Sequence, residues 1–312
     1  DMLYKEEATA PFLLAFTITL IIGLIMWYPV RKFRNDLRLR DGFLIVVLFW
    51  TVLGGFGALP LLFSQSLNLG LTNAVFESIS GLTTTGATII TNLDELPKSI
   101  LFYRQILQWI GGMGVIVLAL AILPMLGVGG MQLYRAETSG LVKDTKLTPR
   151  IKETAKALWY IYLSLTVACA LGYWVAGMGV FDAVSHSFST VAIGGFSTHN
   201  ESIGYFRSAP IEAVSIIFML LSGINFGLHF ITWKSQSLCH YLKDAEFRTY
   251  LFVIISITLI AAVFLRVNEV YLSLDEAFAK AIFHTVSIAT TTGFTTSHYY
   301  FWPTFLPLLL LL

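Results

Sequence analysis

The stretch SGLTTTGATII, Ser80–Ile90, lies between apolar runs and yet carries three successive threonines followed by a glycine. Two similar peptides occur further along the chain, STVAIGGFSTH from Ser189 and SIATTTGFTTSH from Ser287. Glycine and threonine in this density are typical of turns and extended backbone rather than of helix interiors. The recurrence predicts that one local structure is built three times.

The remainder of the sequence is typical of a polytopic, all-α membrane protein. Of its 312 residues 56% are hydrophobic and 12% are charged, whereas soluble domains carry about 25% charged residues. Apolar runs near the roughly 20 residues that a membrane-crossing helix needs recur along the chain. These runs are Ala10–Tyr28, Phe43–Phe63, Ile106–Gly130, Leu158–Met178, Ile211–Phe230 and Leu251–Leu265. The net charge of +1 gives no indication of nucleic-acid binding, and we expect none.

Basic residues gather in three segments, Arg31–Arg40, Arg135–Lys156 and Lys234–Arg248. By the positive-inside rule we predict that all three are cytoplasmic. Two apolar runs separate each basic segment from the next, and a polar peptide lies between the two runs. The chain returns to the cytoplasm only if that peptide enters the membrane and leaves on the same side. The sequence therefore predicts a repeated unit of helix, re-entrant loop and helix.

This repeat defines the predicted domains. Residues 1–40 form an extra transmembrane helix with a basic loop, 41–130 the first pore unit, and 131–156 a cytoplasmic loop. Residues 157–233 form the second pore unit, 234–247 another cytoplasmic loop, and 248–312 a third pore unit cut short in its second helix. Because the chain begins with Asp1 and stops within an apolar run, we read it as a fragment.

The three loops align on one glycine each. The aligned tetrads are Thr84-Thr85-Gly86-Ala87, Ile193-Gly194-Gly195-Phe196 and Thr291-Thr292-Gly293-Phe294. A short amphipathic segment precedes each tetrad, and we predict that it is a helix capped by its first residue. These segments are Asn73–Glu77, Asp182–His186 and Asp275–Ala279.

The predicted chemistry is that of a cation filter made of backbone carbonyls. A short helix directs its carbonyl end, which is partly negative, toward the loop. Unpaired carbonyls in the loop can replace the hydration shell of a cation, and glycine accepts the positive φ that turns them to one side. None of the tetrads contains Asp or Glu, and neutral carbonyls suit a monovalent cation better than a hard divalent one.

Close helix packing is the structural alternative, because Gly, Ser and Thr are common where membrane helices touch. Three such stretches at corresponding positions favour a filter over packing. The GGMG sequence at Gly111–Gly114 follows no strand and carries no lysine, so we interpret it as a packing site and not as a phosphate loop.

Several blocks resemble the superfamily of K⁺ transporters that includes TrkH, TrkG and KtrB, and most closely its TrkH branch. They include VFESISGLTTTGAT, DELPKSILFYRQILQWIGGMGVIVLA and HSFSTVAIGGFSTH, and matches extend from about Arg40 to the end. The resemblance implies four K⁺-channel-like pore units fused in one chain with pseudo-fourfold architecture. The fourth unit, the fourth filter and the gating residues are absent from this sequence.

The resemblance also implies the function: K⁺ uptake across the bacterial inner membrane through a gated, selective pore, without enzymatic activity. K⁺ is then the bound ion, and the implied partners are a second copy of the chain, membrane lipid and a cytosolic RCK ring, called TrkA in this branch, which alone carries nucleotide. The filter positions carried over are Thr84, Thr85, Gly86, Ala87, Ile193, Gly194, Gly195, Phe196, Thr291, Thr292, Gly293 and Phe294.

Two other function classes stay open at this point. An H⁺- or Na⁺-coupled secondary transporter also uses broken helices, but such proteins place ionisable groups at the membrane midplane, where this sequence has few. A membrane-embedded hydrolase using Glu77 and His186 lacks a spacing that would join a nucleophile to a base.

Five polar residues within or near the apolar runs need individual interpretations. For Glu77 we predict a hydrogen bond to a neighbouring loop rather than cation attraction. His186 and His284 are predicted to brace or pack, since neither is followed by a second metal ligand four residues later. Arg104 is predicted to snorkel to the interface rather than to line the outer mouth, and Asn225 to face the cavity below the filter or to bond another helix.

Overall fold

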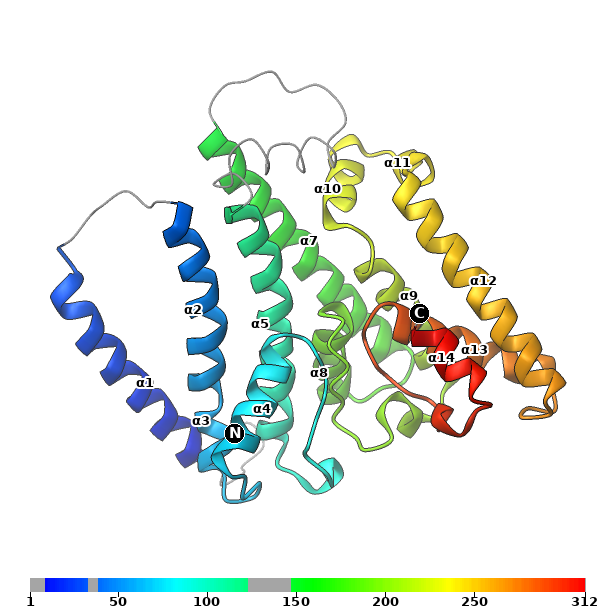
Figure 1. Ribbon diagram of the computed structural model, residues 1–312, viewed down its shortest axis with the longest axis horizontal. Coiled ribbons are helices and arrows are strands. Elements are labelled where there is room, and N and C mark those ends of the chain that lie inside the picture. Colours follow the sequence, from blue (N-terminus) through cyan, green and yellow to red (C-terminus); the bar gives the residue numbers. More distant parts are fainter. Residues whose placement is uncertain (1–8, 33–38, 123–146, 312) are drawn as a thin grey trace. The chain divides into compact units, whose positions relative to one another are not determined.

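The computed structural model describes residues 9–32, 39–122 and 147–311, and all regular elements in these ranges are helices (Figure 1). Three helical segments are long and apolar enough to cross a membrane: α1 (Thr9–Val30), Lys156–Val175 within α7 (Leu147–Val175), and α12 (Ala245–Val267). The pair α9 (Ala209–Ser222) and α10 (Phe226–Ser235) passes the same test together but is bent by 90°. The predicted all-α membrane architecture is confirmed.

The chain folds into two compact units. The first contains residues 1–83 and 87–156, and the second contains 84–86 and 157–312. In the first unit α4 (Leu71–Leu82) packs against α2 (Leu39–Gly57) and α5 (Lys98–Ile122), while α1 contacts α3 (Leu59–Phe63). Their buried apolar side chains are Ala58, Leu61, Ala74 and Ile100.

In the second unit α13 (Leu274–Ala289) lies along α12 and also contacts α9, and α8 (Val180–Val191) packs on α9. α11 (Cys239–Lys243) joins α10 to α12, and α14 (Phe305–Leu311) closes the described chain against α13. Alanines make up much of the contact between α12 and α13 and allow the two backbones to approach closely. They are Ala261, Ala262, Ala277 and Ala281.

Two of the predicted uninterrupted helices are broken, so those predictions were wrong. Within the run Phe43–Phe63, helix α2 ends at Gly57 and a second helix, α3, begins at Leu59. Pro60 explains the break, because proline donates no backbone hydrogen bond and is tolerated only in the first turn of a helix. α5 begins earlier than predicted, at Lys98; the end of the run Ile106–Gly130 lies outside the described residues.

The second break divides the run Ile211–Phe230 between α9 and α10. Asn225 is the N-cap of α10, and its Oδ1 accepts a hydrogen bond from the Gly227 amide at 2.8 Å. Two backbone carbonyls at the end of α9 accept hydrogen bonds from side chains. Leu221 O accepts from His229 Nε2 at 2.8 Å, and Leu220 O accepts from the Tyr250 hydroxyl at 3.4 Å. The prediction that Asn225 faces a cavity or bonds another helix was therefore wrong about its hydrogen bond, which stays within the bend.

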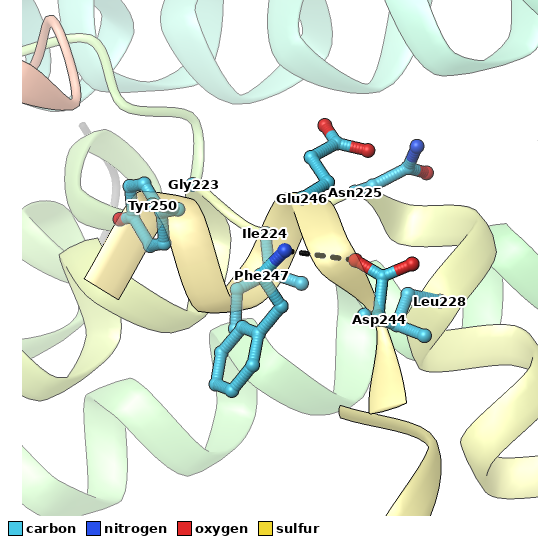
Figure 2. A pocket seen from close by; sticks show the side chains of 8 residues that line it. All are labelled: Gly223, Ile224, Asn225, Leu228, Asp244, Glu246, Phe247 and Tyr250. Atoms are coloured by element: carbon cyan, nitrogen blue, oxygen red, sulfur yellow. Dashed lines mark hydrogen bonds between the residues drawn. The ribbon is translucent and has the colours of Figure 1, made fainter. Parts of the chain in front are cut away.

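A cavity of about 60 Å³ lies at this bend, between the α9–α10 connection and the start of α12. Figure 2 shows its lining side chains, with the hydrogen bond by which Asp244 Oδ1 accepts from the Phe247 amide and caps α12 at 2.8 Å. Such a volume accommodates ordered water. The cavity is thus lined by two helix caps, Asn225 of α10 and Asp244 of α12.

Asn225→Ala is expected to lower the stability of the bend. Loss of an N-cap costs about 1 kcal/mol, so the melting temperature of the detergent-purified protein should fall. Asn268→Ala is the control, because Asn268 is exposed and its amide only bonds Phe264 O of its own helix. Equal melting temperatures for the two variants would contradict the role of Asn225 as the cap that holds the bend.

Gly111 on α5 is a site of close helix packing, as the sequence predicts. A Cβ added there would overlap the carbonyl oxygen of Leu82, the last residue of α4. Helix α4 therefore ends directly against the α5 backbone, and no side chain larger than hydrogen fits between them.

Gly111→Ala is expected to reduce the folded yield, because overpacking a filled helix contact costs about 1–3 kcal/mol. The measurement is the monodisperse fraction on size-exclusion chromatography after extraction in mild detergent. Gly55→Ala on α2 is the matched control, since a Cβ there meets nothing within 4 Å and alanine favours the helix. A normal yield for Gly111→Ala would show that α4 and α5 can move apart without a loss of folded protein, and would contradict the close-packing role of Gly111.

Candidate functional site

Each predicted short helix forms and ends directly before its tetrad. α4, α8 and α13 have Thr83, Ala192 and Thr290 as C-caps, and the tetrads begin one residue later. The predicted N-caps were wrong. The true N-caps are Gly70, Gly179 and Ser273, so Asn73, Asp182 and Asp275 lie inside the first turn. Acidic residues in the first turn, such as Asp182 and Asp275, are also favoured by the partial positive charge of the helix N-terminus.

All three tetrads share an alternating backbone. The first residues, Thr84, Ile193 and Thr291, have φ values of 55°, 54° and 63°, and the aligned glycines have 75°, 79° and 81°. Glycine takes positive φ without steric cost, but a β-branched residue there is a strained outlier of the kind that clusters at functional sites. The first and third residues of each tetrad are thus left-handed, in the pattern that the sequence predicts for the glycines.

Thr84–Gly86 of the first tetrad lies beside the other two tetrads within the second unit. A Cβ added to Gly86 would overlap the carbonyl oxygen of Gly194, and one added to Gly195 would overlap that of Thr292. A Cβ added to Gly293 would meet nothing within 4 Å. Segments about a hundred residues apart in sequence are thus brought together in the order first, second, third. The glycines allow this approach as well as the positive φ.

A serine six residues before each glycine faces the segment that follows it. Ser80 Oγ donates to Ala87 O at 2.6 Å, and Ser287 Oγ donates to Phe294 O at 2.7 Å. Ser189 has the same spacing and is fully buried, but among the described residues its hydroxyl has no hydrogen-bond partner. Two of the three loops are therefore tied back to their own helix at the fourth residue of the tetrad.

A second polar side chain, nine residues before each glycine, reaches the chain just beyond the tetrad. Glu77 Oε1 accepts from the Thr88 hydroxyl at 2.8 Å, and its Oε2 accepts from the Ile89 amide at 3.1 Å. The prediction that Glu77 bonds a neighbouring loop is confirmed. Its side chain is fully buried, so these bonds replace water that the carboxylate has lost.

The two histidines at this position confirm the predicted bracing. His186 Nδ1 donates to Asp182 O at 2.9 Å, which leaves Nε2 to accept from the Ser197 hydroxyl at 2.9 Å. His284 Nδ1 donates to Lys280 O at 2.9 Å, and its Nε2 accepts from the Thr296 amide at 3.5 Å. Both rings therefore hold the same neutral tautomer, fixed by the carbonyl four residues earlier.

Arg104 does not snorkel to an interface, and that prediction was wrong. Its side chain is fully buried: Nε donates to Glu77 Oε1 at 2.8 Å, Nη2 lies 2.7 Å from the same oxygen, and Nη2 also bonds Thr88 Oγ1 at 3.0 Å. A carboxylate on α4 faces the guanidinium on α5, so the two charges neutralise each other. Sequence reasoning missed this pair because its members are 27 residues apart.

Asp182 and Glu212 also hold close partners in the second unit. Asp182 Oδ1 accepts from the Thr198 hydroxyl at 2.7 Å, directly after the second tetrad. Glu212 on α9 pairs with Lys280 on α13 at 2.9 Å. Both carboxylates near these loops are therefore occupied by protein partners, and the ligands that the tetrads themselves offer are neutral backbone carbonyls.

The geometry of three equivalent loops agrees with the sequence comparisons. The family model described as TrkH, cation transport protein, matches residues 9–312. The chain belongs to the TrkH family. The resemblance stated from sequence is thereby confirmed, and with it the membrane-embedded character of the chain.

Relatives in the TrkH family come from several bacteria. The Trk system potassium uptake protein TrkH of Vibrio parahaemolyticus is 58% identical over 99% of this chain and 64% of its own length. TrkH of Escherichia coli K12 is 57% identical over 99% of this chain, and TrkG of the same strain is 42% identical over all of it. The match covers 64% of the length of each of these two proteins. The chain thus spans about 64% of the length of these relatives.

A solved structure of the TrkH family has the same fold. The crystal structure of the potassium transporter TrkH from Vibrio parahaemolyticus matches with a TM-score of 0.89 at 53% identity, over 99% of this chain and 63% of that chain. The predicted fold class, helix–pore loop–helix units in a K⁺-channel-like arrangement, is consistent with this likeness.

Proposed function

We propose that this chain supplies three of the filter segments of a gated, K⁺-selective pore for potassium uptake across the bacterial inner membrane. The observation that carries the proposal is the set of three tetrads lying side by side, each left-handed at its first and third residues. The relatives are potassium uptake proteins of the Trk system, which supports K⁺ as the transported ion.

The proposed filter consists of the twelve tetrad residues, and its ligands are their backbone carbonyls. The carbonyls of Ala87 and Phe294 are the exceptions, because they accept from Ser80 and Ser287 of the preceding helices. Carbonyl dipoles can replace the hydration shell of K⁺ one oxygen at a time. Neutral ligands of this kind suit a large monovalent cation, whereas Ca²⁺ and Mg²⁺ favour carboxylates. The nearby carboxylates Glu77, Asp182 and Glu212 hold protein partners, which argues for a carbonyl filter.

The pore units proposed for this organisation are residues 41–130, 157–233 and 248–312. The Trk-system names of the relatives support a multi-subunit assembly. We include in the proposal a homodimer in contact with lipid, bound on its cytosolic side to a TrkA-type RCK ring that carries the regulatory nucleotide. Nothing in this proposal requires an enzymatic step.

The test is ion flux in liposomes that contain the natural full-length protein, without an imposed H⁺ or Na⁺ gradient. A selective pore passes K⁺ down its own gradient and faster than Na⁺. Flux that occurs only when H⁺ or Na⁺ is driven alongside would overturn the pore and identify a coupled transporter, in which the glycine loops bind ions without forming a continuous filter.

A further inference from the structure

The position nine residues before each tetrad glycine has the same chemistry in all three loops, although its residue type differs. Glu77, His186 and His284 stand nine residues before Gly86, Gly195 and Gly293. Each presents a hydrogen-bond acceptor to its own chain two or three residues after the glycine. A carboxylate and two neutral imidazoles therefore perform one geometric task.

This bond anchors the end of each tetrad that is farther from its helix. At the near end the tetrad continues the helix hydrogen bonding: Gly194 N bonds Ser189 O at 2.9 Å, and Gly293 N bonds Ser287 O at 3.1 Å. At the far end the acceptor holds Ser197 in the second loop and Thr296 in the third. The second and third extended segments are thus fixed at both ends to the helix that precedes each of them.

Both anchors matter because the tetrad backbone is strained. A β-branched residue with positive φ persists only where its surroundings over-determine it, and Thr84, Ile193 and Thr291 are such residues. If the far end is released, the peptide can relax toward an ordinary extended strand, in which successive carbonyls alternate in direction.

We infer that Glu77, His186 and His284 are positioning residues for ion selectivity, because each holds the far end of its tetrad with a hydrogen-bond acceptor. This inference rests on the proposed function, in which the tetrad carbonyls are the K⁺ ligands. The three residues touch no ion themselves: they act through the backbone segments that they hold.

The three anchors are of unequal strength. The first is a buried network in which Glu77 accepts from Thr88, Ile89 and Arg104. The third rests on the 3.5 Å bond to His284 together with the serine bond of Ser287. The second combines a 2.9 Å bond to His186 with a serine, Ser189, whose hydroxyl has no hydrogen-bond partner in the described chain. Asp182 Oδ1 also accepts from the Thr198 hydroxyl at 2.7 Å, one residue beyond the His186 bond. The second and third tetrads are therefore held through a neutral imidazole, and the first through a buried carboxylate.

The test compares His186→Leu with His186→Gln in the full-length protein in liposomes. Leucine removes the acceptor, and glutamine restores an acceptor oxygen on a side chain of similar reach. We expect the K⁺/Na⁺ permeability ratio to fall about three- to tenfold in His186→Leu, as loss of one buried hydrogen bond implies, and to recover in large part in His186→Gln. His284→Leu and His284→Gln repeat the comparison in the third loop.

Tyr173→Phe is the control for the second loop, because the Tyr173 hydroxyl bonds Thr190 and Ser215 and does not hold the segment after the tetrad. Ser273→Ala is the control for the third, since Ser273 only caps α13. Both controls should lower folded yield without changing the permeability ratio. Should His186→Leu fail to fold, the His284 pair decides the question alone.

The outcomes separate this inference from the proposed function. A wild-type protein that conducts selectively, with leucine variants as selective as wild type, would overturn the positioning role and leave the pore intact. A ratio that falls equally in leucine and glutamine variants would also overturn it, because the acceptor would not be the cause. A wild-type protein without selective K⁺ flux would instead overturn the proposed function.

Discussion

Gly195→Ala is expected to abolish K⁺ over Na⁺ selectivity. Gly195 has φ of 79°, and a Cβ there would overlap the carbonyl oxygen of Thr292 in the adjacent tetrad. The substitution therefore imposes backbone strain of about 1–3 kcal/mol and also displaces a proposed ligand. We expect the permeability ratio in liposomes to approach one, while the amount of folded protein falls less steeply.

Substitutions at two other glycines distinguish the effect of backbone strain from the effect of overlap with a neighbouring carbonyl. Gly177 has φ of 101° and lies in a turn outside the tetrads, where an added Cβ meets nothing within 4 Å, so Gly177→Ala tests strain alone. Gly293→Ala adds strain within a tetrad but without overlap, and its effect on selectivity should lie between the other two. Equal selectivity of the Gly195→Ala and Gly177→Ala proteins would contradict the proposal that the tetrads form the selectivity filter.

Arg104→Leu is expected to cause the largest loss of stability of any single substitution considered. It leaves the Glu77 carboxylate buried without its guanidinium partner, and breaking a buried ion pair in this way costs about 3–5 kcal/mol. The measurement is the melting temperature and the monodisperse yield of the purified protein. Arg266→Leu is the control, because Arg266 is exposed at the end of α12.

The double variant Glu77→Gln/Arg104→Met tests whether stability requires the ion pair itself or only the volume that its two side chains fill. Replacing both partners of a buried ion pair by neutral residues of similar volume is often nearly neutral, so this variant should recover much of the lost stability. A double variant as unstable as Arg104→Leu would contradict the assignment of the loss to an unpaired charge.

The repeat and the glycine register could be predicted from sequence because both rest on local patterns. Three short amphipathic segments, each followed by a glycine, predict helices α4, α8 and α13 and the positive φ of Gly86, Gly195 and Gly293, as found. The glycine follows the first residue of the segment by 13 positions in the first two loops and by 18 in the third, where the helix is longer. A single sequence contains this information because glycine is the residue that adopts such backbone without cost.

The left-handed conformation of Thr84, Ile193 and Thr291 could not be predicted in the same way. β-branched residues disfavour positive φ, so local propensity predicts the opposite conformation. The tertiary hydrogen bonds of the neighbouring segments override it. The ion pair of Glu77 with Arg104 was missed for a related reason: a buried partner 27 residues away leaves no periodic signal.

The bend between α9 and α10 did leave a signal. Gly223 and Asn225 interrupt an otherwise apolar run, and glycine followed by asparagine is a common way to end one helix and cap the next. Hydropathy averaged over a window of about 20 residues conceals such a break, which is why one span was predicted where the structure has two helices at 90°.

The three loops belong to one polypeptide, and their anchoring residues are already different: glutamate in one, histidine in two. In a pore built from identical subunits, a single codon change alters every filter segment at once. In the proposed pore a codon change alters one segment and leaves the others as they were. Its selectivity can therefore change by smaller steps than that of a pore with identical subunits.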